Sequence, residues 1–146
     1  MSERDMRLGF GKGKKTDASP GASSESLVAA RLKEFCNGDD DLYSTMSRLM
    51  FLDPKKIMTP LDTILSEAQE YEAQGNKLRA EVAYRIAGGI SLYKGDVGAV
   101  DKYFSKAASL AGGSHPEYQV ILKRSGEAVA VARKYYEEFG PSAAQN

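Results

Sequence analysis

The chain has 146 residues, of which 42% are hydrophobic and 27% are charged, which is enough to enclose one hydrophobic core. Its 20 basic and 20 acidic residues cancel to a formal net charge of +0, and this argues against a surface devoted wholly to nucleic acid or anionic lipid. No stretch reaches the roughly 20 apolar residues that span a bilayer, and the first residues lack the apolar run of a secretory signal. We therefore expect a cytoplasmic protein with a single domain and no membrane contact.

The first 24 residues are rich in Gly, Lys and Ser and predict a flexible, disordered tail. Within residues 1–15, five basic residues outnumber two acidic ones. A glycine-rich cationic strand can follow a phosphate backbone, so contact with RNA or a ribosome is an alternative function for this chain. The residues that would make the contact are Arg4, Arg7, Lys12, Lys14 and Lys15.

Two helices are predicted in the next part of the chain. After Ser26, apolar residues recur at spacings of three and four up to Cys36, and Asn37-Gly38 ends this helix. The acidic triplet 39–41 then places negative charge at the start of a second helix. We interpret the triplet as a cap, because the following residues lack the Gly and closing Glu of a calcium-binding loop. A short turn follows over 53–58.

The segment Thr59-Pro60-Leu61-Asp62 resembles a capping box and predicts a helix that begins near Pro60. Three helices should follow one another here, because a glycine that ends one is joined directly to a residue that starts the next. The two junctions are Gly75-Asn76 and Gly95-Asp96. Connections this short force neighbouring helices to run antiparallel. The apolar faces predicted for the second and third of these helices include Leu78, Val82 and Val97.

The last predicted helix begins at a second capping box, formed by Ser114 and Glu117, after a break at Gly112-Gly113. Its apolar stripe continues without interruption from Tyr118 to Phe139, and Gly140-Pro141 ends it. Residues 141–146 are predicted to be disordered. No window alternates with a period of two, so we expect an all-α fold with one domain over 25–140. It should be an antiparallel bundle or short superhelix of about five or six helices.

Small and aromatic residues between residues 61 and 112 resemble a tetratricopeptide repeat. The residues that carry the resemblance are Ala68, Tyr71, Gly75, Ala80, Tyr84 and Ala87, with a second, partial match at Gly95, Val100, Phe104 and Ala107. The second match starts twenty residues after the first, whereas a regular repeat is about 34 residues long, and the usual tryptophan is missing. The resemblance implies a curved stack of helices with a groove for a protein or peptide, and no enzyme activity.

The residue types that carry catalysis or bind metals are scarce in this chain. Cys36 is the sole cysteine and His115 the sole histidine, which excludes intrachain disulfides and multi-cysteine or multi-histidine metal sites. We expect Cys36 to be buried and inert, His115 to lie on the surface of a turn, and the glutamates between 67 and 72 to form a solvated helix face. Residues 9–16 fail as a phosphate-binding loop, because Lys15 stands where Ser or Thr is needed. No catalytic, metal or cofactor site is predicted.

Two features of the predicted helix after Asn76 point to packing or binding. Gly88-Gly89 costs on the order of 2 kcal/mol relative to alanine, which favours close approach of a neighbouring helix over a kink or a ligand on exposed backbone. Basic residues also alternate with tyrosines here and in the next helix, a mixture that packs at a half-buried rim, stacks on bases or holds an acidic peptide. The residues predicted to bind a protein partner are Arg79, Arg85, Tyr93, Lys94 and Lys102.

Overall fold

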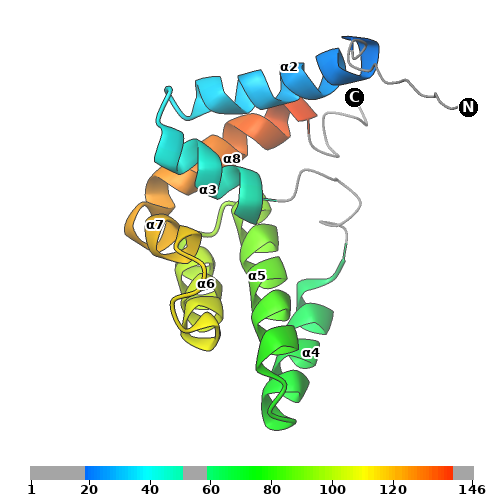
Figure 1. The fold of residues 1–146 in the computed structure, drawn as a ribbon. Helices are drawn as coiled ribbons and strands as arrows, with labels where there is room; N and C mark the ends of the chain where they lie inside the picture. The colour runs from blue at the N-terminus through cyan, green and yellow to red at the C-terminus, as the bar shows by residue number, and fades with distance from the viewer. Residues whose placement is uncertain (1–18, 51–58, 140–146) are drawn as a thin grey trace, which may run out of the picture.

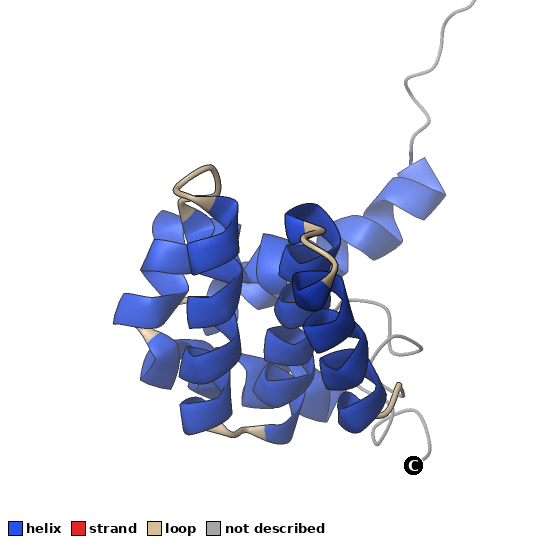
Figure 2. Ribbon diagram, turned by 90° about the horizontal axis from the view of Figure 1, so that it is seen from below, coloured by secondary structure: helices blue, strands red, loops and turns tan. Residues whose placement is uncertain are grey.

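The computed structural model describes residues 19–50 and 59–139, with side chains from residue 27 onward. These described residues form seven helices and no strand, so the all-α prediction is confirmed (Figures 1 and 2). The helices are α2 (Ser19–Phe35), α3 (Asp40–Leu49), α4 (Leu61–Ala73), α5 (Lys77–Lys94), α6 (Val97–Ala111), α7 (Glu117–Lys123) and α8 (Ser125–Phe139). Among the described helices, none has the length and apolar character needed to cross a membrane.

The predicted tail boundary at residue 24 falls inside a helix. α2 begins at Ser19, and its second residue is Pro20, whose fixed φ suits the first turn of a helix. The predicted turn over 53–58 and the predicted disordered end over 141–146 lie outside the described residues, as do residues 1–18.

Helices α4, α5 and α6 form what we call the three-helix layer, in which α5 lies between its two antiparallel neighbours (Figure 1). Both predicted junctions are confirmed. Gly75 and Gly95 adopt the left-handed conformation with φ of 78° and 76°, which costs glycine no steric strain. Directly after them, Asn76 Oδ1 accepts the backbone N–H of the residue three positions on at 3.2 Å, and Asp96 Oδ1 does the same at 3.0 Å.

Close packing explains the buried glycine pair in the middle of α5. A Cβ atom at Gly88 would lie 2.6 Å from ring carbons of Phe104 in α6, so only glycine lets the two helices approach at this point. The helix continues unbroken through Gly88 and Gly89, and both residues are buried. The predicted close approach of a neighbouring helix is therefore confirmed at Gly88.

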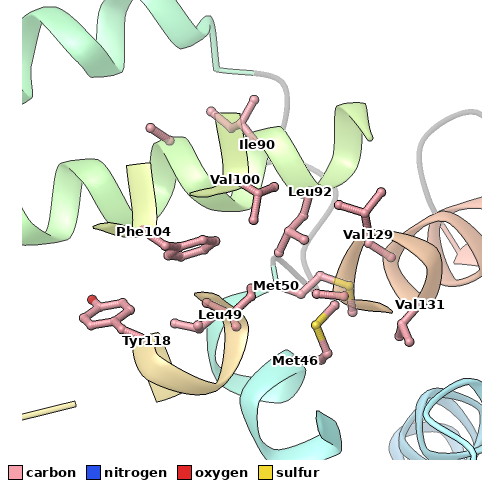
Figure 3. Close-up of a cluster of buried hydrophobic side chains, with 14 of the residues drawn as sticks. Met46, Leu49, Met50, Ile90, Leu92, Val100, Phe104, Tyr118, Val129 and Val131 are labelled. Atoms are coloured by element: carbon pink, nitrogen blue, oxygen red, sulfur yellow. The ribbon is translucent and has the colours of Figure 1, made fainter. Parts of the chain in front are cut away.

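The remaining helices pack around the end of this layer. α2 lies along α8, and α3 contacts α7 (Figure 1). One continuous core joins all of them, because methionine and leucine side chains of α3 meet side chains of α5, α6, α7 and α8 (Figure 3). The buried residues labelled in that view are Met46, Leu49, Met50, Ile90, Leu92, Val100, Phe104, Tyr118, Val129 and Val131.

The prediction of a single long C-terminal helix from Tyr118 to Phe139 is wrong, because the chain bends at Arg124 between α7 and α8. Arg124 has φ −130° and ψ 36°, outside the helical region. Its guanidinium lies 2.7 Å from Asp39 Oδ2 and 2.8 Å from Glu127 Oε1, and its carbonyl accepts the first hydrogen bond of α8. These ion pairs, which tie the bend to the start of α3, lower the pKa of Asp39 and of Glu127.

Both predicted capping boxes are also wrong, although the acidic cap of α3 is confirmed. The N-cap residues of α4 and α7 are Pro60 and Pro116, and neither makes a side-chain cap hydrogen bond. The Ser114 hydroxyl instead donates to the preceding carbonyl of Ala111 at 2.7 Å. At α3, by contrast, Asp39 Oδ1 accepts the backbone N–H of the third helical residue at 3.1 Å.

Four apolar residues that the helical spacing placed in apolar faces are exposed, one of them Leu27 of α2 at 67%. Leu78 is 71% exposed, Val82 42% and Val97 39%. Leu78 and Val82 of α5 are exposed because the helices packed on this part of α5, α4 and α6, cover only two of its sides. The third side of its first two turns carries Leu78 and Val82, and none of the described helices packs on this side closely enough to bury them.

Candidate functional site

The five residues predicted to bind a partner do not converge on one place. Arg79 and Arg85 lie in the first half of α5, Tyr93 and Lys94 lie at its end, and Lys102 lies on α6. At a rise of 1.5 Å per residue, Arg79 and Lys94 are about 22 Å apart along the helix axis. The structure therefore divides the predicted set into separate surfaces.

The end of α5 is mainly a packing site. The ring of Tyr93 meets that of Tyr136 in α8 edge to face, with centroids 5.0 Å apart. Tyr93 and Lys94 line a hollow of about 240 Å³ that Arg133 and Glu137 also border. Lys102 lies over the ring of its neighbour Tyr103 at 5.8 Å, and it does not share this hollow.

The first half of α5 exposes a surface that we call the α5 strip, made of Leu78, Val82 and Arg85. Their spacing of four and then three residues puts them on one face of the helix, and all three are exposed. Arg79 borders the strip on the side of α4, where its guanidinium lies 5.9 Å from the ring centroid of Tyr71. Two of the predicted binding residues thus adjoin an exposed apolar pair.

Beside Arg85 the surface is hollowed by what we call the α3–α7 cleft. It consists of two adjoining hollows of about 400 and 340 Å³ that share Arg48, His115 and Glu117. Arg85 lines the smaller hollow together with Tyr118, and Asp41 lines the larger one. The cleft therefore begins at the α5 strip and runs between α3 and the start of α7.

A buried carboxylate lies next to this cleft. Glu81 of α5 is only 6% exposed, and its Oε2 accepts a hydrogen bond from the Tyr118 hydroxyl at 2.9 Å and lies 3.4 Å from His115 Nε2. Burial and the hydrogen bond to Glu81 raise the pKa of Tyr118, while the nearby Arg85 guanidinium opposes this rise. His115 lies in the loop before α7 with its side chain 43% exposed, in agreement with the predicted surface position, and it also contacts Glu81 of α5.

The cations around the strip differ in how their charge is matched. Arg48 Nε lies 3.6 Å from Glu117 Oε2 across the cleft. Within the described residues, Arg79 and Arg85 have no carboxylate oxygen within 4.0 Å. The α5 strip is therefore bordered by two arginines that have no ion-pair partner in the described part of the chain, whereas the far end of the cleft carries Asp41.

The described residues assemble no group typical of catalysis. They contain no cluster of three His, Cys, Asp or Glu side chains that could hold a metal ion. No hydrogen bond in the described part joins a hydroxyl or thiol to His115, and the neighbouring Ser114 hydroxyl is bonded to a backbone carbonyl. Cys36 is buried as predicted, and burial raises the pKa of its thiol to about 11. The site presents charges beside an apolar surface.

Several residues of the site were missed by reasoning from the sequence. Glu81 could have been found from the sequence. It precedes Tyr84 by three residues, Gly88 by seven and Leu92 by eleven, and this spacing places it on the same buried face of α5. An acidic residue on such a face requires a partner. Arg48 had no signal, since its role depends on the packing of α3 against α7.

The tail residues of the alternative prediction, Arg4, Arg7, Lys12, Lys14 and Lys15, lie outside the described residues. The structure therefore gives no position for the predicted nucleic-acid contact.

In comparisons with known proteins, no family model, no curated protein and no solved structure matches this chain.

Proposed function

We propose that this protein is a non-enzymatic interaction module that binds a segment of a partner protein on the α5 strip and the adjoining α3–α7 cleft. The observation that carries the proposal is the exposure of Leu78 and Val82 on one face of α5. Each apolar side chain of this size gains about 1.5–3 kcal/mol when it is fully buried. A partner that covers this pair therefore gains binding free energy by burying apolar surface that the fold leaves exposed.

The surroundings of the strip are those of a small interface. Apolar residues at the centre with polar and charged residues at the rim are typical of surfaces that bind other proteins. Arg79 and Arg85 supply such a rim, and arginine is the cation most enriched among residues that dominate binding energy. The cleft gives a partner side chain a place to enter beside Arg85.

The tetratricopeptide-like resemblance is part of this proposal. The small residues Ala68, Ala80 and Ala87 are fully buried, as expected where paired helices approach closely. In a stack of helix pairs, the face left uncovered by neighbouring helices forms the binding groove, and the α5 strip is a face of this kind.

Two matched valine variants test the proposal. Val82→Ser removes apolar surface from the strip, whereas Val97→Ser makes the same change at a residue of nearly equal exposure on α6, 39% against 42%. Partners that copurify with the full chain from its own source should be lost with Val82→Ser and kept with Val97→Ser. Both variants should keep the wild-type melting temperature, and equal copurification with both would contradict the proposal.

The same purification separates this function from the alternative one. If the chain contacts RNA or a ribosome through its basic tail, nuclease treatment or deletion of residues 1–15 should remove the associated material. If the α5 strip carries the function, both treatments should leave the protein partner in place.

A further inference from the structure

The charges beside the α5 strip restrict the chemistry of its partner. At 100° per residue, Arg79 and Arg85 lie on opposite sides of Leu78 and Val82 around the helix. Neither guanidinium has a carboxylate within 4.0 Å in the described part of the chain. The apolar pair is thus bordered on both sides by an arginine that no described carboxylate pairs with.

Covering this surface would take both arginines partly out of water. A basic partner would add charge repulsion to this desolvation, and a neutral partner would offer only hydrogen-bond acceptors without charge, which compensate it less well. A carboxylate would offset that loss, because arginine binds it through two parallel N–H···O hydrogen bonds. Nucleic acid also carries negative charge, but its backbone offers no apolar side chains for Leu78 and Val82.

The cleft supplies the position for such a carboxylate. The hollow beside Arg85 measures about 340 Å³ and is also lined by Arg48 and His115. Glu117 already contacts Arg48 at 3.6 Å, and Glu81 accepts from Tyr118. Arg85 interacts with the Tyr118 hydroxyl, but among the described residues it is the one cation lining this hollow that has no carboxylate oxygen within 4.0 Å.

We infer that the partner is an acidic and apolar protein segment. Its aliphatic or aromatic side chains cover Leu78 and Val82, and an Asp or Glu side chain binds Arg85 at the mouth of the α3–α7 cleft. This inference rests on the proposed function and adds the chemical class of the bound segment.

Selection from a random peptide library on the full-length protein tests the inference. The enriched peptides should combine Asp or Glu with Leu, Ile or Phe, and fluorescence anisotropy should show that Arg85→Glu weakens their binding at least about tenfold. Replacing the acidic residue of the best peptide by lysine should restore its binding to Arg85→Glu. Arg133→Glu, which changes an exposed arginine of α8, should leave the affinity unchanged.

Arg85 lies near Tyr118 and Glu81, so Arg85→Glu could weaken binding by disturbing the fold. A second variant controls for this effect. Arg85→Gln removes the charge while keeping a polar side chain, and it should weaken binding with an unchanged circular dichroism spectrum. Peptides that lose affinity for Val82→Ser but bind Arg85→Glu and Arg85→Gln normally would overturn this inference and leave the proposed function standing. Failure to enrich any peptide sensitive to Val82→Ser would overturn both.

Discussion

The three-helix layer and the paired helices α2 and α8 share one apolar core but differ in the other contacts that hold them in place. Within the layer, alanine and glycine let the helices approach, and the Phe104 ring packs directly on Gly88. Around α2 and α8, arginine ion pairs connect distant parts of the chain. Arg31 reaches Glu138 at the end of α8, and Arg124 joins Asp39 to Glu127.

This difference predicts how the stability of each region responds to substitutions, to salt and to pH. Packing forces act over short distances and respond to single methyl groups, but they depend little on salt. Exposed ion pairs contribute modestly and are screened by salt. The layer should therefore be the rigid frame that presents the α5 strip, while the α2–α8 side should respond to ionic strength and pH.

The largest effect should follow truncation of the ring at the centre of the layer. Phe104 is fully buried, and Phe104→Ala should lower the free energy of unfolding by about 3–5 kcal/mol because it leaves a cavity. Urea denaturation in low and in high salt should give the same loss. A loss that shrank strongly with salt would contradict the division into packed and ion-paired regions.

A smaller effect should follow from adding one methyl group beside that ring. Gly88→Ala forces the new Cβ atom against Phe104, and the overpacking should outweigh the better helix propensity of alanine, for a net loss of about 2 kcal/mol. Gly126→Ala in α8 is the matched control, because a Cβ there meets nothing within 4 Å. It should raise the free energy of unfolding, and equal responses at the two glycines would contradict the expected contrast.

The hydrogen bond at the boundary of the cleft should have an intermediate effect. Tyr118→Phe removes the donor to the buried carboxylate of Glu81 and should cost about 1 kcal/mol or more of stability. Tyr84→Phe removes a similar donor, at 2.6 Å, to Glu72, whose side chain is 34% exposed and remains hydrated. Thermal unfolding of both variants should show the larger loss for Tyr118→Phe.

The smallest effect at neutral pH should come from the ion pairs on the α2–α8 side. Arg124→Gln should lower the melting temperature slightly in low salt, and the difference should nearly vanish in high salt. Differential scanning calorimetry at both salt concentrations measures this. A loss as large in high salt as in low salt would show that Arg124 acts through packing.

The same variant makes a prediction for the pH dependence of stability. Arg124 lowers the pKa of Asp39 below its ordinary value of 3.8 and that of Glu127 below 4.5. A depressed carboxyl pKa stabilises the folded state above those ordinary values, and the stabilisation is lost as the pH falls through the folded-state pKa. Wild-type stability should therefore decline on acidification below about pH 5, and Arg124→Gln should decline less steeply in urea denaturation across that range.

The candidate site was predictable in part. Arg79 and Arg85 were both predicted to bind a partner, Arg85 because it follows Tyr84, and both adjoin the exposed pair Leu78 and Val82. Leu78 and Val82 were assigned to an apolar face, because helical spacing identifies a face but does not reveal how many neighbours cover it. His115 and Arg48 join the site through the packing of α3 and α7 against α5, which no local pattern encodes.

Local backbone chemistry is what the amino-acid sequence determined by itself. Gly75 and Gly95 tolerate a positive φ, and each is followed at once by a capping residue, Asn76 or Asp96. These pairs determine the end of α4, both ends of α5 and the start of α6, because both effects act within one turn of the chain. Tertiary contacts decided the rest. The bend at Arg124 and the exposure of the α5 strip depend on groups that meet across the fold, where distances are set by packing and not by sequence separation.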